Sequence, residues 1–149
     1  MKLWLLRHGE AEAYADRDHN RRLTQYGQDQ VSAVSARLEQ QRPERVLVSP
    51  YVRAQQTASI VRDVIGHDIQ MSTVSWLTPD TPVDETFSHL ETPESGDLLL
   101  VAHQPLLGTL CSLLVYGSTD RAFPLGTAAL VELEGEVILA GGMALRAIH

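Results

Sequence analysis

Cysteine is almost absent from this sequence, and its scarcity limits the chemistry available to the chain. Cys111 is the one cysteine in 149 residues, so an internal disulfide and a metal site built from several thiolates are excluded. Because Cys111 lies within the apolar stretch 110–114, we interpret it as a buried packing thiol rather than a nucleophile.

Basic residues are also few. The 12 lysines and arginines face 19 acidic residues, for a formal net charge of −7. The chain therefore lacks the cationic excess that holds a nucleic-acid backbone, and no nucleic-acid partner is expected. An acidic surface repels small anions at long range, so any anion site must depend on locally placed arginines.

Long apolar runs are missing as well. The apolar run after Lys2 stops at Arg7, which is too short for a secretory signal. No other stretch approaches the length of a membrane span. A soluble cytoplasmic protein with no membrane partner is the expectation that follows.

What the sequence does contain is an alternation of strand and helix patterns. With 44% hydrophobic residues and no repeat or linker, residues 1–149 are expected to form a single domain. Aliphatic runs predict strands in four places: Leu3–Leu6, Val46–Val48, Ile69–Val74 and Leu98–Ala102.

Helical signals lie between these strands. Thr24 is placed to cap a first helix, and Ser49-Pro50 reads as the N-cap and first-turn proline of a second. Asp84–Leu90 predicts a short third helix, and Pro105 begins a fourth. The prediction is an α/β fold, a three-layer α/β/α arrangement with a mainly parallel central sheet.

The end of the chain predicts a departure from the parallel pattern. Ala128–Leu133 and Glu136–Ala140 flank Glu134-Gly135, which is typical of a hairpin. We therefore expect one antiparallel strand in the sheet.

The ends of the predicted strands carry the residues that suggest chemistry. Arg7-His8-Gly9 follows the first strand, Arg53 lies just beyond the second, and His103 ends the strand with the strongest pattern. Open α/β sheets place their ligands at such strand ends. These positions predict one pocket that binds a phosphoryl group.

Each side chain has a distinct expected role. A neutral imidazole at His8 can accept a phosphoryl group covalently, and Gly9 lets the backbone approach a ligand closely. Arg7 and Arg53 can bind phosphate oxygens and disfavour the imidazolium form of His8. His103 can donate to a phosphoryl oxygen as charge builds on it.

The roles of other polar residues are not decided by the sequence. Arg22 is a candidate contact for the phosphate or for the rest of the substrate, although a solvated basic loop with its neighbours explains it nearly as well. An acidic loop residue is a candidate proton donor, with none singled out: Glu10, Glu12, Asp16 and Asp18.

These segments resemble the histidine phosphatase superfamily, which has the phosphoglycerate-mutase-like fold. Arg7-His8-Gly9 is similar to the signature of the family, in which the histidine is the phosphorylated nucleophile. Arg53, within residues 49–57, is similar to its second phosphate-binding arginine.

The resemblance extends over nearly the whole chain. His103, within residues 101–105, is similar to the second histidine of the family. Residues 23–28 resemble its Leu-Thr-x-x-Gly segment, with Arg22 close by. Within the superfamily, the segments 7–11, 45–50 and 77–79 are most similar to the short SixA-type phosphohistidine phosphatases.

The resemblance implies a phosphatase that hydrolyses phosphohistidine on a carrier or phosphotransfer protein, in signal transduction, without a metal or other cofactor. Larger branches carry an acidic proton donor in a longer segment before the second histidine. That segment is short here and offers only candidates: Asp80, Asp84, Glu85 and Glu91. A site without a firm general acid favours P–N over P–O cleavage.

Three alternatives share the pocket. The substrate of a phosphomonoesterase would be a small phosphorylated metabolite or nucleotide. A module that binds phosphoprotein without turnover is a second alternative, although binding alone needs no nucleophile. A metal hydrolase is a third, which two arginines in the same site disfavour. We expect a monomer in each case.

Overall fold

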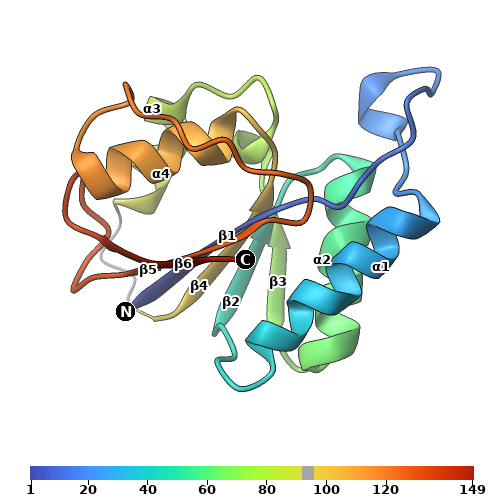
Figure 1. The fold of residues 1–149 in the computed structure, drawn as a ribbon, viewed down its shortest axis with the longest axis horizontal. Helices are drawn as coiled ribbons and strands as arrows, with labels where there is room; N and C mark the ends of the chain where they lie inside the picture. Colours follow the sequence, from blue (N-terminus) through green and yellow to red (C-terminus); the bar gives the residue numbers. More distant parts are fainter. Residues whose placement is uncertain (92–95) are drawn as a thin grey trace.

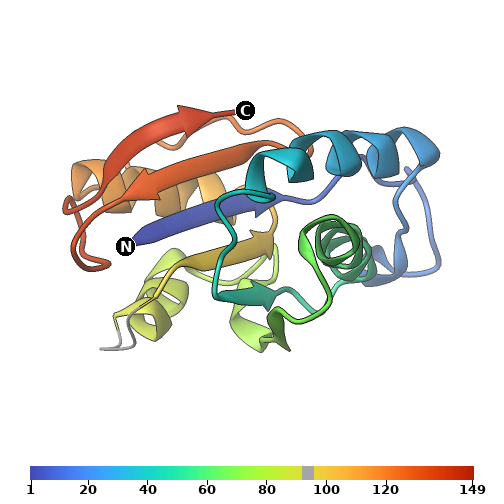
Figure 2. The same ribbon diagram turned by 90° about the horizontal axis from the view of Figure 1, so that it is seen from below.

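The computed structural model describes residues 1–91 and 96–149. Within these ranges one sheet has the strand order β3-β2-β4-β1-β5-β6, which Figure 2 shows from below. The strands are β1 (Lys2–Arg7), β2 (Arg45–Val48), β3 (Gln70–Thr73), β4 (Leu98–Ala102), β5 (Leu130–Glu134) and β6 (Ala144–Ile148).

The strand directions confirm the predicted sheet. Strands β1 to β4 are parallel, and β5 is antiparallel to both of its neighbours, β1 and β6. In the part of the chain that the structure describes, β5 is therefore the strand that opposes the others.

Helices cover both faces of the sheet, as predicted. They are α1 (Gln25–Ser35), α2 (Val52–Ile65), α3 (Val83–Leu90) and α4 (Leu106–Tyr116). Helices α1 and α2 lie on one face, and α3 and α4 lie on the other (Figure 1). Short 3-10 turns occur at Asp18–Asn20, Ala36–Leu38 and Ser75–Leu77.

The alternation of side chains along β1 explains why both faces need a cover. Leu3 and Leu5 are buried in the core under α3 and α4, whereas Trp4 and Leu6 are buried in the core under α1 and α2. Strand β4 alternates in the same way. Complete burial of each such side chain stabilises the fold by about 1.5–3 kcal/mol.

Two local predictions are confirmed. The Oγ1 of Thr24 accepts a hydrogen bond from the Gly27 N–H and caps α1. Cys111 is buried in α4, where desolvation raises the pKa of its thiol to about 12. A thiol held in this state is a packing group, as its apolar surroundings in the sequence indicate.

Two others are wrong. The predicted hairpin is present, but its second strand is Ala144–Ile148 rather than Glu136–Ala140. The connection is longer because Gly141 turns the chain with a φ of 68° before β6 begins. The second helix begins at Val52 after the N-cap Tyr51, so neither Ser49 nor Pro50 starts it.

Candidate active site

The register of the parallel strands brings the two histidines together. Arg7 is the partner of Ala102 between β1 and β4, so His8 and His103 are the next residues on adjacent strands. The His8 N–H donates to the Ala102 carbonyl at 3.1 Å. The two rings are 5.1 Å apart between centroids, and both side chains are almost fully buried.

Arg53 enters this pair from the first turn of α2. Its side chain is buried, and its Nε–H donates to Nε2 of His8 at 3.2 Å. Its other nitrogens donate to the carbonyl of Asp18 at 2.8 Å and to the Asp18 carboxylate at 3.2 Å. The predicted arginine therefore touches the predicted nucleophile directly.

Hydrogen bonds define the protonation state of His8. Nδ1 lies 2.7 Å from the Gly9 carbonyl oxygen, which can only accept, so Nδ1 carries the hydrogen. Nε2 accepts a hydrogen bond from Arg53, so it carries no hydrogen and its lone pair points toward the guanidinium. Desolvation lowers the pKa of His8 to about 4, although the bond to Gly9 opposes it, and Arg53 and Arg7 lower it further.

His103 is neutral for similar reasons. Burial lowers the pKa of His103 to about 2, and the neighbouring His8 and Arg53 contribute, while the Asp18 carboxylate opposes the shift. Its Nε2 lies 2.7 Å from the Oγ of Ser49. Its Nδ1 is buried and has no hydrogen-bond partner among the described residues.

Arg7 adds a second cation beside His8. One of its terminal nitrogens donates to the Leu125 carbonyl at 2.7 Å. Its Nε is buried without a partner among the described residues, so it retains a donor for an anion. Burial, and then the charge of Arg53, lower the pKa of Arg7 from its usual value.

The structure gives Gly9 a packing role. An added Cβ would lie 2.4 Å from the Gly27 carbonyl oxygen and 2.9 Å from Cγ2 of Val31, both on α1. The Gly9 N–H already donates to the Oγ1 of Thr57 at 3.2 Å. A close backbone approach does require glycine here, but the approach is to a helix.

Arg22 does not join the two histidines and Arg53 in this structure. Its side chain is exposed and forms no hydrogen bond or ion pair with the residues described. Its neighbour Arg21 pairs with Asp18 at 2.9 Å, and its charge lowers the pKa of His8.

Of the acidic candidates, Asp18 is the one that reaches the site. Partial burial opposes ionisation, but hydrogen bonds from Arg21 and Arg53 keep the pKa of Asp18 below its usual value. Asp18 is therefore an anion at neutral pH and holds no proton to donate.

Sequence reasoning missed three partners of the candidate site residues. Tyr51 lies edge-on to His103 at 5.0 Å between ring centroids, and its ring also faces the Arg53 guanidinium at 5.0 Å. Leu125 contributes only a backbone carbonyl, which leaves no trace in a sequence. Ser49 was visible beside Pro50 and its Oγ does accept from the Tyr51 N–H, but the capping interpretation missed the second bond of this hydroxyl, to His103.

The site differs from a metal centre in its donor set. Across the residues that the structure describes, no three His, Cys, Asp or Glu side chains are grouped as a metal ion requires. His8, the neighbour of His103, instead contacts Arg53, whose cation would oppose a metal ion. The residues present fit an anion.

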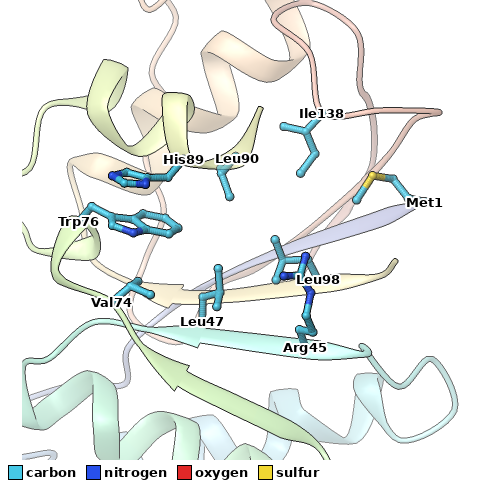
Figure 3. Close-up of a pocket in the computed structure, with 9 residues that line it drawn as sticks. All are labelled: Met1, Arg45, Leu47, Val74, Trp76, His89, Leu90, Leu98 and Ile138. Carbon is cyan, nitrogen blue, oxygen red and sulfur yellow. The ribbon is translucent and has the colours of Figure 1, made fainter. Parts of the chain in front are cut away.

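A separate cavity of about 210 Å³ lies between the sheet and α3. Figure 3 shows Trp76 stacked on His89 at one end and Arg45 and Met1 at the other, with aliphatic side chains between them. None of the histidines and arginines of the candidate site lines it.

Among the residues described, no helix is both long and apolar enough to cross a bilayer.

Comparisons with known proteins agree with the fold. Residues 3–74 match the profile of the histidine phosphatase superfamily (branch 1). The phosphohistidine phosphatase SixA of Escherichia coli (strain K12) is 34% identical over 139 residues, which cover 90% of this chain and 86% of that protein. A SixA homolog of Haemophilus influenzae is 34% identical over 132 residues, with 80% of each chain covered.

A solved structure shows the same arrangement of elements. SixA complexed with tungstate superposes with a TM-score of 0.88 at 29% identity, over 99% of this chain and 96% of that one. The chain therefore belongs to the histidine phosphatase superfamily, a class of hydrolases with the phosphoglycerate-mutase-like fold. Within this superfamily, its relatives at 34% identity place it with the SixA phosphohistidine phosphatases.

Proposed function

We propose that this protein hydrolyses phosphohistidine on a carrier or phosphotransfer protein through a covalent intermediate on His8. The catalytic groups are His8, Arg7, Arg53 and His103, and the arginines and His103 also bind the phosphoryl group. The proposal includes a single domain over residues 1–149 that acts as a monomer in the cytoplasm.

The observation that carries this proposal is the protonation state of His8. Its Nδ1 hydrogen bonds to the Gly9 carbonyl, and its Nε2 lone pair faces the guanidinium of Arg53. Phosphoryl transfer needs chiefly a positioned nucleophile and cationic groups around the phosphate oxygens. A tetrahedral oxyanion, tungstate, was bound in the structure of the SixA relative.

The reaction then follows in two steps. The Arg53 N–H moves from Nε2 of His8 to a phosphoryl oxygen, and Nε2 attacks phosphorus, so that a new P–N bond forms and the P–N bond to the substrate imidazole breaks. The leaving ring departs as a neutral imidazole when its other nitrogen is protonated. Water next attacks phosphorus, and the bond to Nε2 breaks to release inorganic phosphate and neutral His8.

The state of Asp18 favours a phosphohistidine substrate over a phosphate ester. An alkoxide leaving group needs a proton from a general acid, whereas Asp18 is held as an anion by Arg21 and Arg53. The phosphomonoesterase alternative would require a proton donor from elsewhere. A module that only binds phosphoprotein would not need His8 to be oriented as a nucleophile.

Trapping of the intermediate tests the proposal. The protein is incubated with a carrier protein bearing ³²P-labelled phosphohistidine, and acid-labile label on the enzyme is measured after quenching. We expect label on the wild type and none on His8→Ala. His89→Ala is the matched control, because His89 is an exposed imidazole that stacks on Trp76 outside the site.

Two results would contradict the proposal. One is label that persists on His8→Ala. The other is a clear preference for small phosphate esters when turnover is compared across a panel, which would select the phosphomonoesterase alternative. Tight binding of the carrier protein without phosphate release would select the binding module.

A further inference from the structure

The hydroxyl of Ser49 links the backbone at the start of α2 to the second histidine. Ser49 follows β2 and is completely buried, and its N–H donates to the Val101 carbonyl at 3.0 Å. Its Oγ lies 3.2 Å from the Tyr51 nitrogen and 2.7 Å from Nε2 of His103. The register between β2 and β4 places this hydroxyl beside the imidazole.

The direction of these two hydrogen bonds follows from the groups involved. A backbone N–H can only donate, so the Oγ of Ser49 accepts from Tyr51. The hydroxyl hydrogen is then free to donate to Nε2 of His103. In the opposite arrangement Nε2 would carry the hydrogen, and the buried hydroxyl hydrogen would have no acceptor among the described residues.

The tautomer of His103 depends on this direction. A neutral imidazole whose Nε2 accepts must carry its hydrogen on Nδ1. Burial keeps the ring neutral and holds the pKa of His103 at about 2. Nδ1 is thus a buried donor with no acceptor among the described residues, and buried donors without acceptors are unfavourable unless a ligand satisfies them.

We propose that Ser49 is a positioning residue that holds His103 as the Nδ1–H tautomer, so that the neutral ring donates to a bound oxyanion. The oxyanion would be the phosphoryl group between His8 and His103, so the inference rests on the proposed function for its catalytic meaning. Hydrogen bonds aimed at developing charge are among the strongest contributions to catalysis. Without the hydroxyl, the His103 ring stays in place, but its hydrogen is no longer confined to Nδ1.

Nuclear magnetic resonance measures the tautomer without any need for turnover. The protein is labelled with ¹⁵N-histidine, the His103 signals are assigned by their loss in His103→Asn, and long-range ¹H–¹⁵N spectra are recorded. In the wild type we expect the hydrogen on Nδ1. In Ser49→Ala we expect a mixture of tautomers or the Nε2–H form, and in Ser49→Thr the hydroxyl restores the wild-type pattern.

Tungstate is the probe for the bound oxyanion. Its addition should shift the Nδ1 signals of wild-type His103, and its dissociation constant should rise several-fold in Ser49→Ala. With phosphohistidine as substrate, kcat should fall about tenfold or more in Ser49→Ala, and KM should rise no more than the tungstate dissociation constant does, since most of the loss concerns charge that builds in the transition state.

Ser112→Ala is the matched control for a lost buried hydroxyl. The Oγ of Ser112 donates to the Ser118 carbonyl and accepts from the Arg121 N–H, so it has the same pattern of one donated and one accepted bond. It lies on α4, and its Oγ bonds to Ser118 and Arg121 rather than to any site residue. Its loss should lower stability while the His103 tautomer and tungstate binding stay unchanged.

The outcomes separate this inference from the proposed function. Wild-type His103 with its hydrogen on Nε2, or an unchanged tautomer in folded Ser49→Ala, overturns the role of Ser49 whatever the substrate is. A second outcome is that the tautomers and the tungstate effects are as expected but phosphohistidine is not turned over. That outcome supports Ser49 as the positioning residue and refutes the proposed substrate instead. If Ser49→Ala does not fold, Ser49→Cys supplies the same comparison with a much weaker donor.

Discussion

The Nε–H of Arg53 points at the Nε2 lone pair of His8 across 3.2 Å. A cation so close to an imidazole opposes its protonation, and the Gly9 carbonyl on the other side of the ring secures the Nδ1 hydrogen. The arginine that we propose binds the phosphoryl group thereby adds to burial in keeping the proposed nucleophile unprotonated. Both roles depend on the geometry of the guanidinium as well as on its charge.

Replacement of Arg53 by lysine tests that dependence on geometry. Lysine keeps the charge but lacks the Nε–H that faces His8 and the planar fork that reaches Asp18. We expect Arg53→Lys to lower kcat about a hundredfold or more, measured on a phosphohistidine protein. Arg62→Lys on the same helix should retain nearly full activity, and a similar loss in both variants would point to damage to α2.

Acid should destabilise the fold through the two buried histidines. The pKa of His8 is about 4 and that of His103 about 2 in the folded protein, against 6.5 for an ordinary imidazole. Between these values the unfolded chain binds protons that the folded protein excludes. Stability is therefore fully present above pH 6.5 and falls as the pH drops, by up to about 1.4 kcal/mol per pH unit for each histidine.

Denaturant titrations across that pH window measure the effect. His103→Gln should show a smaller loss of unfolding free energy on acidification than the wild type, because it removes one of the two groups. His67→Gln, at an exposed position, should follow the wild type. A wild-type slope that His103→Gln leaves unchanged would refute this linkage.

The charge of Asp18 should weaken the binding of phosphate. Its carboxylate lies 3.2 Å from an Arg53 nitrogen and is largely exposed. Asp18→Asn removes the negative charge, while the Asp18 backbone carbonyl still holds Arg53 at 2.8 Å. Since exposed ion pairs are weak, we expect inhibition by inorganic phosphate to tighten by about three- to fivefold, measured as an inhibition constant.

The comparison for Asp18 is the exposed acid Asp63 on α2, which pairs with His67 away from the site. Asp63→Asn should leave phosphate inhibition unchanged. Weaker phosphate inhibition in Asp18→Asn would show that Asp18 chiefly holds Arg53 in place.

Gly9 should tolerate no side chain. The Cβ of Gly9→Ala would meet backbone and side-chain atoms of α1 at 2.4 and 2.9 Å. We expect an unfolding free energy lower by about 1–3 kcal/mol, and a loss of activity because His8 precedes it. Gly126→Ala, where no heavy atom lies within 4 Å, should be nearly neutral in thermal and chemical denaturation.

Much of the layered fold was predictable because its signals are local. The aliphatic runs of β1 and β4 have apolar residues on both faces, which predicts strands covered by helices on each side. Prediction was incomplete where one sequence pattern is compatible with two structural roles. Ser49-Pro50 has the composition of a helix start, yet the hydroxyl of Ser49 bonds to a residue 54 positions away.

By itself the sequence determined which residues end the buried strands, because hydrophobic periodicity and the following polar residues are properties of short segments. It therefore identified Arg7, His8, Arg53 and His103 as candidates. Only the tertiary structure decided the protonation states of the two histidines, through the carbonyl of Gly9, the hydroxyl of Ser49 and the burial of both rings. Desolvation and hydrogen-bond direction depend on the surroundings of an atom, and those arise when distant segments of the chain pack together.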